Sequence, residues 1–445
     1  MQASDIDFMT AVELRDRIAR RELSPVEVTR RALDKAQATQ ASLNAFCLLL
    51  PDAAMAAARA AEAAVMRRDS LGPLHGVPFS AKDLIAVGGL PFRFGSRTMA
   101  GNIAAADAPP VERAKQAGAI LIGKTTTSEF GCKAVGDNPL DGITRNPWNT
   151  GKTPGGSSAG AAASVAAGVT PLALGTDGGG SIRIPCSLTG LAGIKGQFGR
   201  VPVWPVSATT TLAHVGPMTR NIADAALMFM SIAGYDPRDP YAVAGPVPDL
   251  VEACRANVKG MRVAYSPTLG YVVEQVEQVF DRDPVDLWTA EFYAGIGTRL
   301  RPFLEKQRDI IDPAVADILD AALRQDMRDY YPTVFERYAL REKMRLFFER
   351  YDVLLSPVLP VSSLDVGKNV PDHLGDRNLV SWVYYTYPFN LTGQPAATVC
   401  AGFAADGMPV GLQLVGRSHG EYDVVRAASA YERTQAPDYN VCKPK

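Results

Sequence analysis

From residue 75 onward, short apolar runs alternate with helical segments and glycine-rich turns, and this alternation constrains the fold more than any other feature. The apolar runs are short and bounded by turn residues, which is typical of buried strands. Alternating strands and helices favour an α/β fold with a largely buried, mixed sheet. The predicted strands are residues 77–80, 119–122, 170–174, 263–265 and 353–356, and the predicted helices between them include 110–117, 158–167 and 221–232.

The two ends of the chain add further elements. Thr10 and Glu13 have the spacing of a capping box, and residues 53–68 are rich in alanine, so residues 1–70 are predicted to be helices packed on the α/β core. No linker rich in serine, glycine and proline divides the chain, so residues 1–445 are predicted to form one domain. The remaining predictions are helices at 270–350 and 421–433, a loop at 358–380, and strands at 398–401 and 409–415.

The composition argues against several classes of function. The 445 residues carry 46 basic and 47 acidic side chains, a net charge of −1, whereas nucleic-acid and anionic-membrane surfaces need a basic excess. Six cysteines form no CxxC pair and four histidines no HxxxH or HExxH pattern, so neither a metal site nor a cofactor is expected. The N-terminus lacks a signal-peptide pattern, and no apolar run is long enough to span a membrane. A cytoplasmic protein with reduced thiols and no nucleic-acid or membrane partner is expected.

Glycine and serine are concentrated in two clusters, residues 155–158 and 178–181, with an alanine-rich helix and a strand between them. The second cluster follows the strand directly, so its glycines allow a sharp turn that exposes successive N–H groups. Exposed amides beside the Ser181 hydroxyl provide what acyl transfer needs, a nucleophile and an oxyanion hole. A plain turn, a flexible linker and a phosphate-binding loop are the alternatives.

Two literal motif matches point to other chemistries. Residues 118–125 fit the P-loop pattern GxxxxGK[ST], but the four middle residues are wholly apolar and indicate a buried strand. Residues 156–160 fit the nucleophile elbow GxSxG, which needs a preceding strand and a downstream acid and histidine. A polar turn precedes them instead, although His214, His373 and His419 lie downstream. Both alternatives are therefore weaker than the acyl-transfer interpretation.

Several ordered motifs closely resemble those of the amidase signature family, and the resemblance covers most of residues 10–430. The motifs are 76–83 (GVPFSAKD), 122–125 (IGKT), 146–148 (NPW), 155–160 (GGSSAG), 172–185 (LALGTDGGGSIRIP), 216–220 (GPMTR), 388–395 (PFNLTGQP) and 407–413 (GMPVGLQ). The resemblance implies the amidase signature fold, a large mixed β-sheet covered by helices on both faces.

The resemblance also implies a Ser–cis-Ser–Lys triad. Ser181 would be the nucleophile, Ser157 the bridging serine and Lys82 the base, with intervals of 75 residues (82 to 157) and 24 residues (157 to 181) that agree with the family pattern. The remaining implied site residues are the oxyanion-hole amides of Gly178, Gly179, Gly180 and Ser181, the acyl-pocket residues Gly131 and Cys132, and the supporting polar residues Ser158, Asp177 and Arg183.

A lysine acts as a base near neutral pH only when its pKa is lowered, which burial away from acids achieves. Asp83 follows Lys82 directly and Arg183 is a candidate counter-cation, so the sequence leaves the local charge balance open. Each triad member also has an ordinary alternative role: a surface lysine, a helix-capping serine at position 157 and a turn serine at position 181. Their combination at the family spacing favours the catalytic role.

One segment departs from the family pattern, because residues 268–284 are shorter than the usual helix and strand at this place, which puts the edge of the sheet in doubt. Trp382, Tyr384, Tyr385 and Tyr387 are interpreted either as an aromatic wall for substrate or as core.

The predicted function is hydrolysis of small-molecule amides, with esters and carbamates (urethanes) left open. The alternatives are a glutaminase subunit of a tRNA-dependent amidotransferase and a noncatalytic binding protein. A homodimer is also left open.

Overall fold

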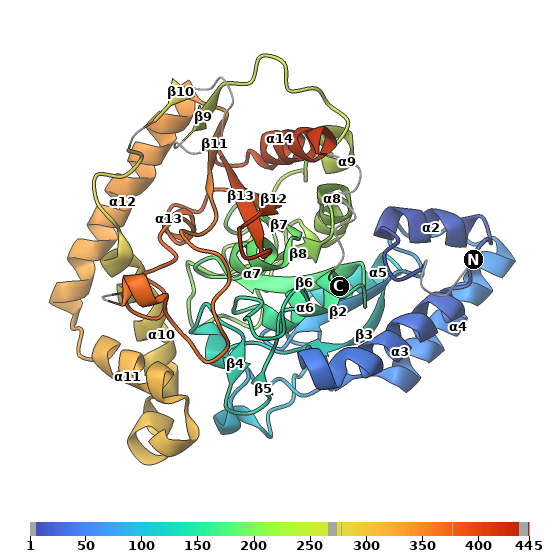
Figure 1. The fold of residues 1–445 in the computed structure, drawn as a ribbon, viewed down its shortest axis with the longest axis horizontal. Coiled ribbons are helices and arrows are strands. Elements are labelled where there is room, and N and C mark those ends of the chain that lie inside the picture. Colours follow the sequence, from blue (N-terminus) through green and yellow to red (C-terminus); the bar gives the residue numbers. More distant parts are fainter. Residues whose placement is uncertain (1–5, 266–273, 277, 376, 436–443, 445) are drawn as a thin grey trace.

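The computed structural model describes residues 6–265, 274–276, 278–375, 377–435 and 444, and its centre is an 11-stranded sheet (Figure 1). The strands follow the order β1-β3-β2-β6-β8-β7-β12-β13-β11-β9-β10. Their bounds are β1 (Phe46–Leu49), β2 (Pro78–Lys82), β3 (Ile120–Thr125), β6 (Leu172–Asp177), β7 (Ala192–Lys195), β8 (His214–Thr219), β9 (Val263–Tyr265), β10 (Glu274–Gln275), β11 (Val353–Pro357), β12 (Ala396–Phe403) and β13 (Pro409–Gly416). A separate small ribbon pairs β4 (Asp137–Asn138) with β5 (Gly142–Ile143).

Helices lie before, between and after the strands. Their bounds are α2 (Ala11–Ala19), α3 (Pro25–Leu43), α4 (Pro51–Arg67), α5 (Pro109–Gln116), α6 (Ala159–Ala166), α7 (Arg183–Thr189), α8 (Ile222–Ile232), α9 (Leu250–Ala253), α10 (Val285–Lys306), α11 (Pro313–Ala322), α12 (Met327–Arg350), α13 (Pro388–Leu391) and α14 (Glu421–Thr434). Within the described residues, none of the helices is both long and apolar enough to cross a membrane.

Both faces of the sheet are buried. Alternate residues of a strand point to opposite sides of the sheet, and residues on both sides belong to apolar clusters. In β3, Leu121 joins the large apolar cluster formed with α2, α5, α8 and α14, whereas Ile120 and Ile122 join a cluster with α3 and α4. In β6, Ala173 faces α6 and α7, while its neighbours Leu172 and Leu174 face the large cluster. The predicted mixed sheet with helices on both faces is therefore confirmed.

The sheet combines parallel and antiparallel pairs, and this pattern positions the site. Strand β2 lies parallel to both β3 and β6, so the carboxyl ends of all three strands meet at one edge. Lys82 is the last residue of β2 and Asp177 the last of β6. Polar groups that follow buried parallel strands gather at such an edge, which explains how residues 95 positions apart in the sequence (82 to 177) become neighbours.

The structure corrects the predicted fold at several places. Residues 46–49, predicted to be helical, form strand β1 at one edge of the sheet. Strands β7 and β8 were not predicted. Residues 268–273 and 277 of the shortened segment lie outside the described residues, and the adjoining edge of the sheet is formed by β10, which pairs in parallel with β9. The capping box at Thr10 is present as predicted.

The P-loop match is a strand. Residues 120–125 form β3 and are all buried, and the Nζ atom of Lys124 lies 2.5 Å from the Oδ1 atom of Asp83. A nucleotide-binding lysine must instead project from an exposed loop. No strand leads directly into residues 156–160, because residues 144–155 lie outside the named strands, so the nucleophile-elbow arrangement is absent as well.

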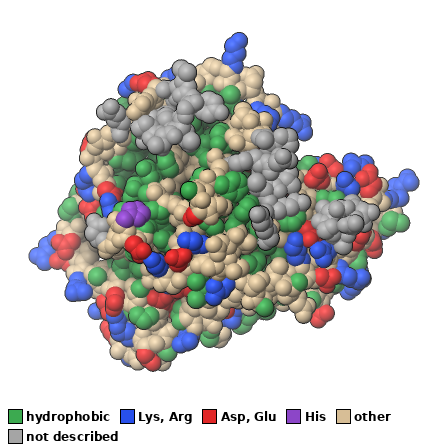
Figure 2. Space-filling model, viewed as in Figure 1, with side chains coloured by type: hydrophobic (Ala, Val, Ile, Leu, Met, Phe, Trp, Pro, Cys, Tyr) green, Lys and Arg blue, Asp and Glu red, His purple; other side chains and the backbone are tan. Residues whose placement is uncertain are grey.

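The surface agrees with a net charge close to zero. On the face shown in Figure 2, acidic and basic side chains are interspersed rather than gathered into a patch of one sign. Among the described residues, Cys47, Cys132, Cys186 and Cys254 are free thiols, the Cys400 thiol donates to the carbonyl of Gly402 at 3.6 Å, and Cys442 lies outside these residues.

The pairing of β1 with β3 makes a testable prediction. A Cβ atom at Gly123 would lie 2.4 Å from the carbonyl oxygen of Leu48, so Gly123→Ala must displace the edge strand. We expect the free energy of unfolding to fall by about 1–3 kcal/mol, the usual cost of overpacking, in urea denaturation followed by circular dichroism. The control is Gly101→Ala, because a Cβ atom there meets no heavy atom within 4 Å. Equal stability of the two variants would contradict the pairing of β1 with β3.

Candidate active site

Lys82, the predicted base, is fully buried at the end of β2. Its Nζ atom lies 2.6 Å from Ser157 Oγ, 3.0 Å from Ser158 Oγ and 2.8 Å from Thr176 Oγ1. These partners are hydroxyl groups, which donate or accept and carry no charge. Burial lowers the pKa of Lys82 well below its usual 10.5, and the more distant charge of Asp177 opposes this only in part. The neutral amine is therefore accessible far below the pH at which a solvated lysine loses its proton.

Asp83, next in sequence to Lys82, faces a different cation. Its carboxylate accepts from Lys124 Nζ at 2.5 Å and from the backbone N–H of Arg93 at 3.3 Å. Asp83 and Lys124 are both fully buried, so each neutralises the other. The charge balance that the sequence left open is therefore resolved: the acid beside Lys82 forms its ion pair elsewhere.

Ser157 lies between Lys82 and an open cavity. It is 2% exposed, and its hydroxyl makes the shortest of the three contacts with Lys82 Nζ. The Gly156–Ser157 peptide bond is cis, the geometry expected from the family resemblance. Gly131, one of the predicted pocket residues, lies next to Ser157, because a Cβ atom at position 131 would be 3.2 Å from Ser157 Oγ. The absence of a side chain there leaves the hydroxyl accessible from the cavity.

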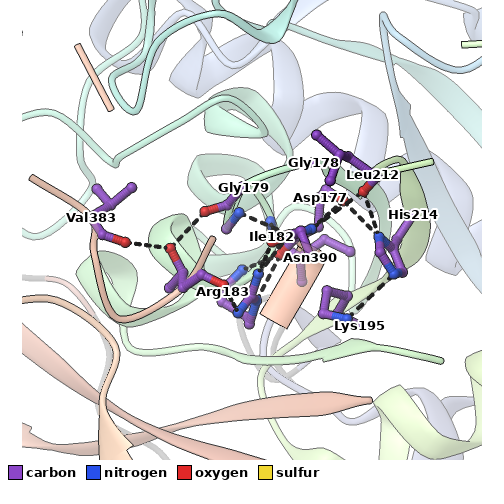
Figure 3. A network of polar contacts seen from close by, with 12 residues as sticks. Asp177, Gly178, Gly179, Ile182, Arg183, Lys195, Leu212, His214, Val383 and Asn390 are labelled. Carbon is purple, nitrogen blue, oxygen red and sulfur yellow. Dashed lines mark hydrogen bonds and ion pairs between the residues drawn. The ribbon is translucent and has the colours of Figure 1, made fainter. Parts of the chain in front are cut away.

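Asp177 organises the glycine turn that follows β6 (Figure 3). Its carboxylate accepts from the backbone N–H groups of Gly180 at 2.8 Å and Ile182 at 3.2 Å, so it holds the turn from inside. It also forms an ion pair with Arg183 at 2.8 Å, and both side chains are fully buried. Burial alone would raise the pKa of Asp177, but the adjacent guanidinium outweighs it and holds that pKa well below its usual range.

Arg183 joins this turn to the C-terminal half of the chain. All five of its side-chain N–H groups have an acceptor: two bonds reach Asp177, and the others reach Thr386 O at 2.8 Å, Gln413 Oε1 at 2.7 Å and Asn390 Oδ1 at 2.7 Å. These three partners were not predicted as site residues from the sequence. Asn390 and Gln413 do lie inside the motifs 388–395 and 407–413, so the motifs contained the signal but not the contact.

A second group, which the sequence analysis also missed, holds the carbonyl of Asp177. His214 Nδ1 lies 3.1 Å from Asp177 O and 2.8 Å from Leu212 O, and Asn390 Nδ2 donates to Asp177 O at 3.1 Å (Figure 3). Lys195 Nζ lies 3.4 Å from His214 Nε2. Burial first, and then the nearby Lys195, lower the pKa of His214 well below its usual value. A neutral imidazole with its proton on Nδ1 fits these contacts.

The glycine turn leaves part of its backbone free. Within the described residues, the N–H groups of Gly178, Gly179 and Ser181 have no acceptor. Gly180 differs from the prediction, because its N–H already donates to Asp177. Of the four predicted oxyanion donors, Gly178, Gly179 and Ser181 therefore have N–H groups that are available to a substrate oxygen. The Ser181 side chain is partly exposed at this turn.

Ser157, Ser181, Gly131 and Gly178 line a cavity of about 280 Å³. Its other walls are largely apolar, with aromatic side chains from Phe92, Phe94, Phe130, Trp204, Phe292 and Phe303. Predicted pocket residue Cys132 does not line it: its side chain is fully buried, and its carbonyl accepts from the Tyr293 hydroxyl at 3.0 Å.

The aromatic residues near position 385 do not line this cavity. Trp382 and Tyr387 are fully buried, so they belong to the core. The aromatic walls come instead from the loops after β2, β3 and β7 and from α10. Among the described residues, no group of three His, Cys, Asp or Glu side chains is placed to hold a metal ion.

Known proteins share both this sequence pattern and this fold. The sequence profile of the amidase family matches residues 27–286 and 305–425. An acylamidase from Rhodococcus erythropolis is 36% identical over 463 residues, covering 97% of this chain and 96% of the relative. A glutamyl-tRNA(Gln) amidotransferase subunit from Geobacter metallireducens is 34% identical over 478 residues, covering 96% of this chain and 97% of the relative.

The fold also matches that of solved structures of this family. A solved bacterial aryl acylamidase of the amidase signature family superposes with a TM-score of 0.90 at 28% identity, covering 98% of each chain. The profile spans most of the chain, and the two relatives above exceed 30% identity over nearly their whole lengths. The chain therefore belongs to the amidase signature family, whose members hydrolyse C–N bonds of amides.

Proposed function

We propose that this chain hydrolyses small aryl or otherwise apolar amides through an acyl-enzyme on Ser181. The observation that carries this proposal is the burial of Lys82 among hydroxyl groups, with Ser157 at 2.6 Å on the side of the cavity. A lysine in this environment loses its proton at a lower pH than a solvated lysine does, and its neutral amine can then act as a base.

The reaction begins when the Ser181 hydroxyl attacks the substrate carbonyl. Its proton passes to Ser157, whose own proton passes to neutral Lys82, so the nucleophile forms without a free alkoxide. The N–H groups of Gly178, Gly179 and Ser181 donate to the carbonyl oxygen as it gains negative charge. Collapse of the tetrahedral intermediate releases the amine, which takes the proton back through Ser157, and water then hydrolyses the acyl-enzyme by the same route.

The walls of the cavity favour an apolar substrate. Aromatic side chains surround a volume of about 280 Å³, close to the lower end of the usual range for small-molecule sites. The likeness to an acylamidase from Rhodococcus erythropolis and to a bacterial aryl acylamidase supports aryl amides. Esters and carbamates (urethanes) present the same carbonyl to Ser181, so the proposal extends to both as substrates of the same mechanism.

A second candidate is supported by the likeness to the glutamyl-tRNA(Gln) amidotransferase subunit. In that role the chain would release ammonia from glutamine within a complex that acts on tRNA. The apolar walls favour the first candidate, because the carboxylate and ammonium groups of glutamine would lose water against aromatic rings. We expect the isolated chain to cleave anilides and to leave glutamine intact; glutaminase activity without anilide cleavage would reverse this order.

Substitution of the nucleophile tests the acyl-enzyme. Ser181→Ala is expected to lower kcat by at least about 10³-fold on a panel of one anilide, one aryl ester and one aryl carbamate. Intact-mass measurement of the unmodified protein should detect an acyl adduct on Ser181 during ester turnover. The matched control is Ser207→Ala, which changes a serine of the same cavity wall and should retain activity within a few fold. Full activity of Ser181→Ala would contradict the mechanism, and a panel with no turnover would favour a binding protein.

The pH profile tests the base. Lys82 must be neutral to accept a proton, so kcat/KM on an uncharged anilide should rise with pH as the Lys82 ammonium is lost. Because burial lowers the pKa of Lys82 well below 10.5, this rise should be complete well below the pH at which a solvated lysine titrates. Lys82→Arg keeps its charge throughout and should be inactive at every pH. A rise centred near pH 10.5, or a rise retained in Lys82→Ala, would contradict the assignment.

A further inference from the structure

Large apolar side chains are exposed along one side of α12, together with charged residues such as Glu336, Glu342 and Arg345. Thirteen large hydrophobic side chains are exposed among the described residues, and five of them lie on this one helix, each between 48% and 68% exposed. They are Met327, Tyr331, Phe335, Tyr338 and Leu346, called here the α12 stripe. The helix lies at the outer edge of the molecule (Figure 1). A concentration of large exposed apolar side chains on one helix is typical of an interaction surface.

The opposite side of α12 fixes this orientation. Arg337, Met344 and Phe348 are buried, and Arg337 donates to the carbonyl of Leu391 at 2.8 Å. Met344 and Phe348 belong to the apolar cluster that also contains Leu354 of β11. The helix therefore cannot rotate to bury the α12 stripe against its own chain. Some other molecule must cover the stripe if it is to be removed from water.

The spacing of the α12 stripe suits a second copy of the same chain. Together with Glu342, the stripe has steps of 4, 4, 3, 4 and 4 residues (327, 331, 335, 338, 342, 346), the same in both directions. We propose that α12 pairs antiparallel with α12 of a second copy, about a twofold axis between residues 336 and 337, to form a homodimer. A twofold interface requires such a self-complementary surface.

The contacts across this axis are chemically matched. Phe335 faces Tyr338 of the second copy, and Met327 faces Leu346. Tyr331 faces Glu342, so its hydroxyl, which has no partner among the described residues, donates to a carboxylate. Glu342 is exposed and already bonds to Arg345 at 2.7 Å, which keeps a compensating charge beside it.

The size of the α12 stripe sets the strength of the dimer. Burying its six aromatic rings and the four flanking Met and Leu side chains of both copies removes on the order of 1,000 Å² from water, the lower end of specific interfaces. We therefore expect a reversible dimer whose population depends on protein concentration. No residue of the stripe lines the cavity beside Ser181, so the interface and the proposed activity fail or hold independently.

Sedimentation velocity between about 0.5 and 100 µM tests the interface. The full chain should shift from monomer to dimer as its concentration rises, whereas Phe335→Glu/Tyr338→Glu should stay monomeric and keep the circular dichroism and activity of the unmodified chain. The matched control is Met66→Glu, an equally exposed apolar residue on α4, which should still dimerise. A full chain that is monomeric throughout, or a double variant that dimerises like the full chain, would overturn the proposal.

Disulfide trapping tests the antiparallel register separately. A chain with Met327→Cys, mixed with a chain carrying Leu346→Cys, should give a cross-linked dimer on mild oxidation. Neither variant alone should cross-link beyond the unmodified chain, because residues 19 positions apart on a helix (327 to 346) are separated by about 28 Å. Cross-linking of Met327→Cys to itself indicates a parallel pair and overturns the proposal.

Discussion

The buried ion pair between Asp177 and Arg183 is the interaction on which the rest of the site depends. One carboxylate holds the glycine turn through the N–H groups of Gly180 and Ile182, and one guanidinium joins that turn to residues 386, 390 and 413. Charges without water are stable only when every donor and acceptor is matched, and all five N–H groups of Arg183 are. The position of the free amides of the turn is therefore fixed by contacts from opposite halves of the chain.

Lys82 requires uncharged neighbours, although it lies close to the Asp177–Arg183 ion pair. Its amine has hydroxyl neighbours, while the acid next in sequence forms a complete ion pair with Lys124. A carboxylate in contact with Lys82 would stabilise its ammonium form and remove the base. The site thus contains the Asp177–Arg183 ion pair and, near it, Lys82, which has no carboxylate in contact. The ends of the parallel strands β2 and β6 keep Lys82 and Asp177 apart.

Much of this could be predicted from the sequence, and the failures have physical causes. Strongly apolar runs such as β2, β3 and β6 were located correctly, because burial on both faces leaves a continuous hydrophobic signal. Strand β8 was missed, because a strand with the sequence HVGPMT has neither alternation nor β-branched enrichment. The spacing of the motifs predicted that Lys82, Ser157 and Asp177 belong to one site. It did not predict that the N–H of Gly180 donates to Asp177 or that the Cys132 side chain is buried away from the cavity. These two features depend on the orientation of side chains from distant segments, which cannot be inferred from a local sequence pattern.

The cavity draws its parts from two separate sources. The reacting groups come from the sheet edge and the two glycine-serine clusters, whereas the aromatic walls come from loops and from α10, which lie outside the strands that hold Lys82 and Asp177. Substitutions in the walls can therefore alter which acyl or amine group is accepted while the hydrolytic centre keeps its shape. Substrate range can therefore diverge within one scaffold through changes in the wall residues alone. A mutagenesis library aimed at new substrates should vary residues 203–209 and the inner face of α10 and leave the glycine turn unchanged.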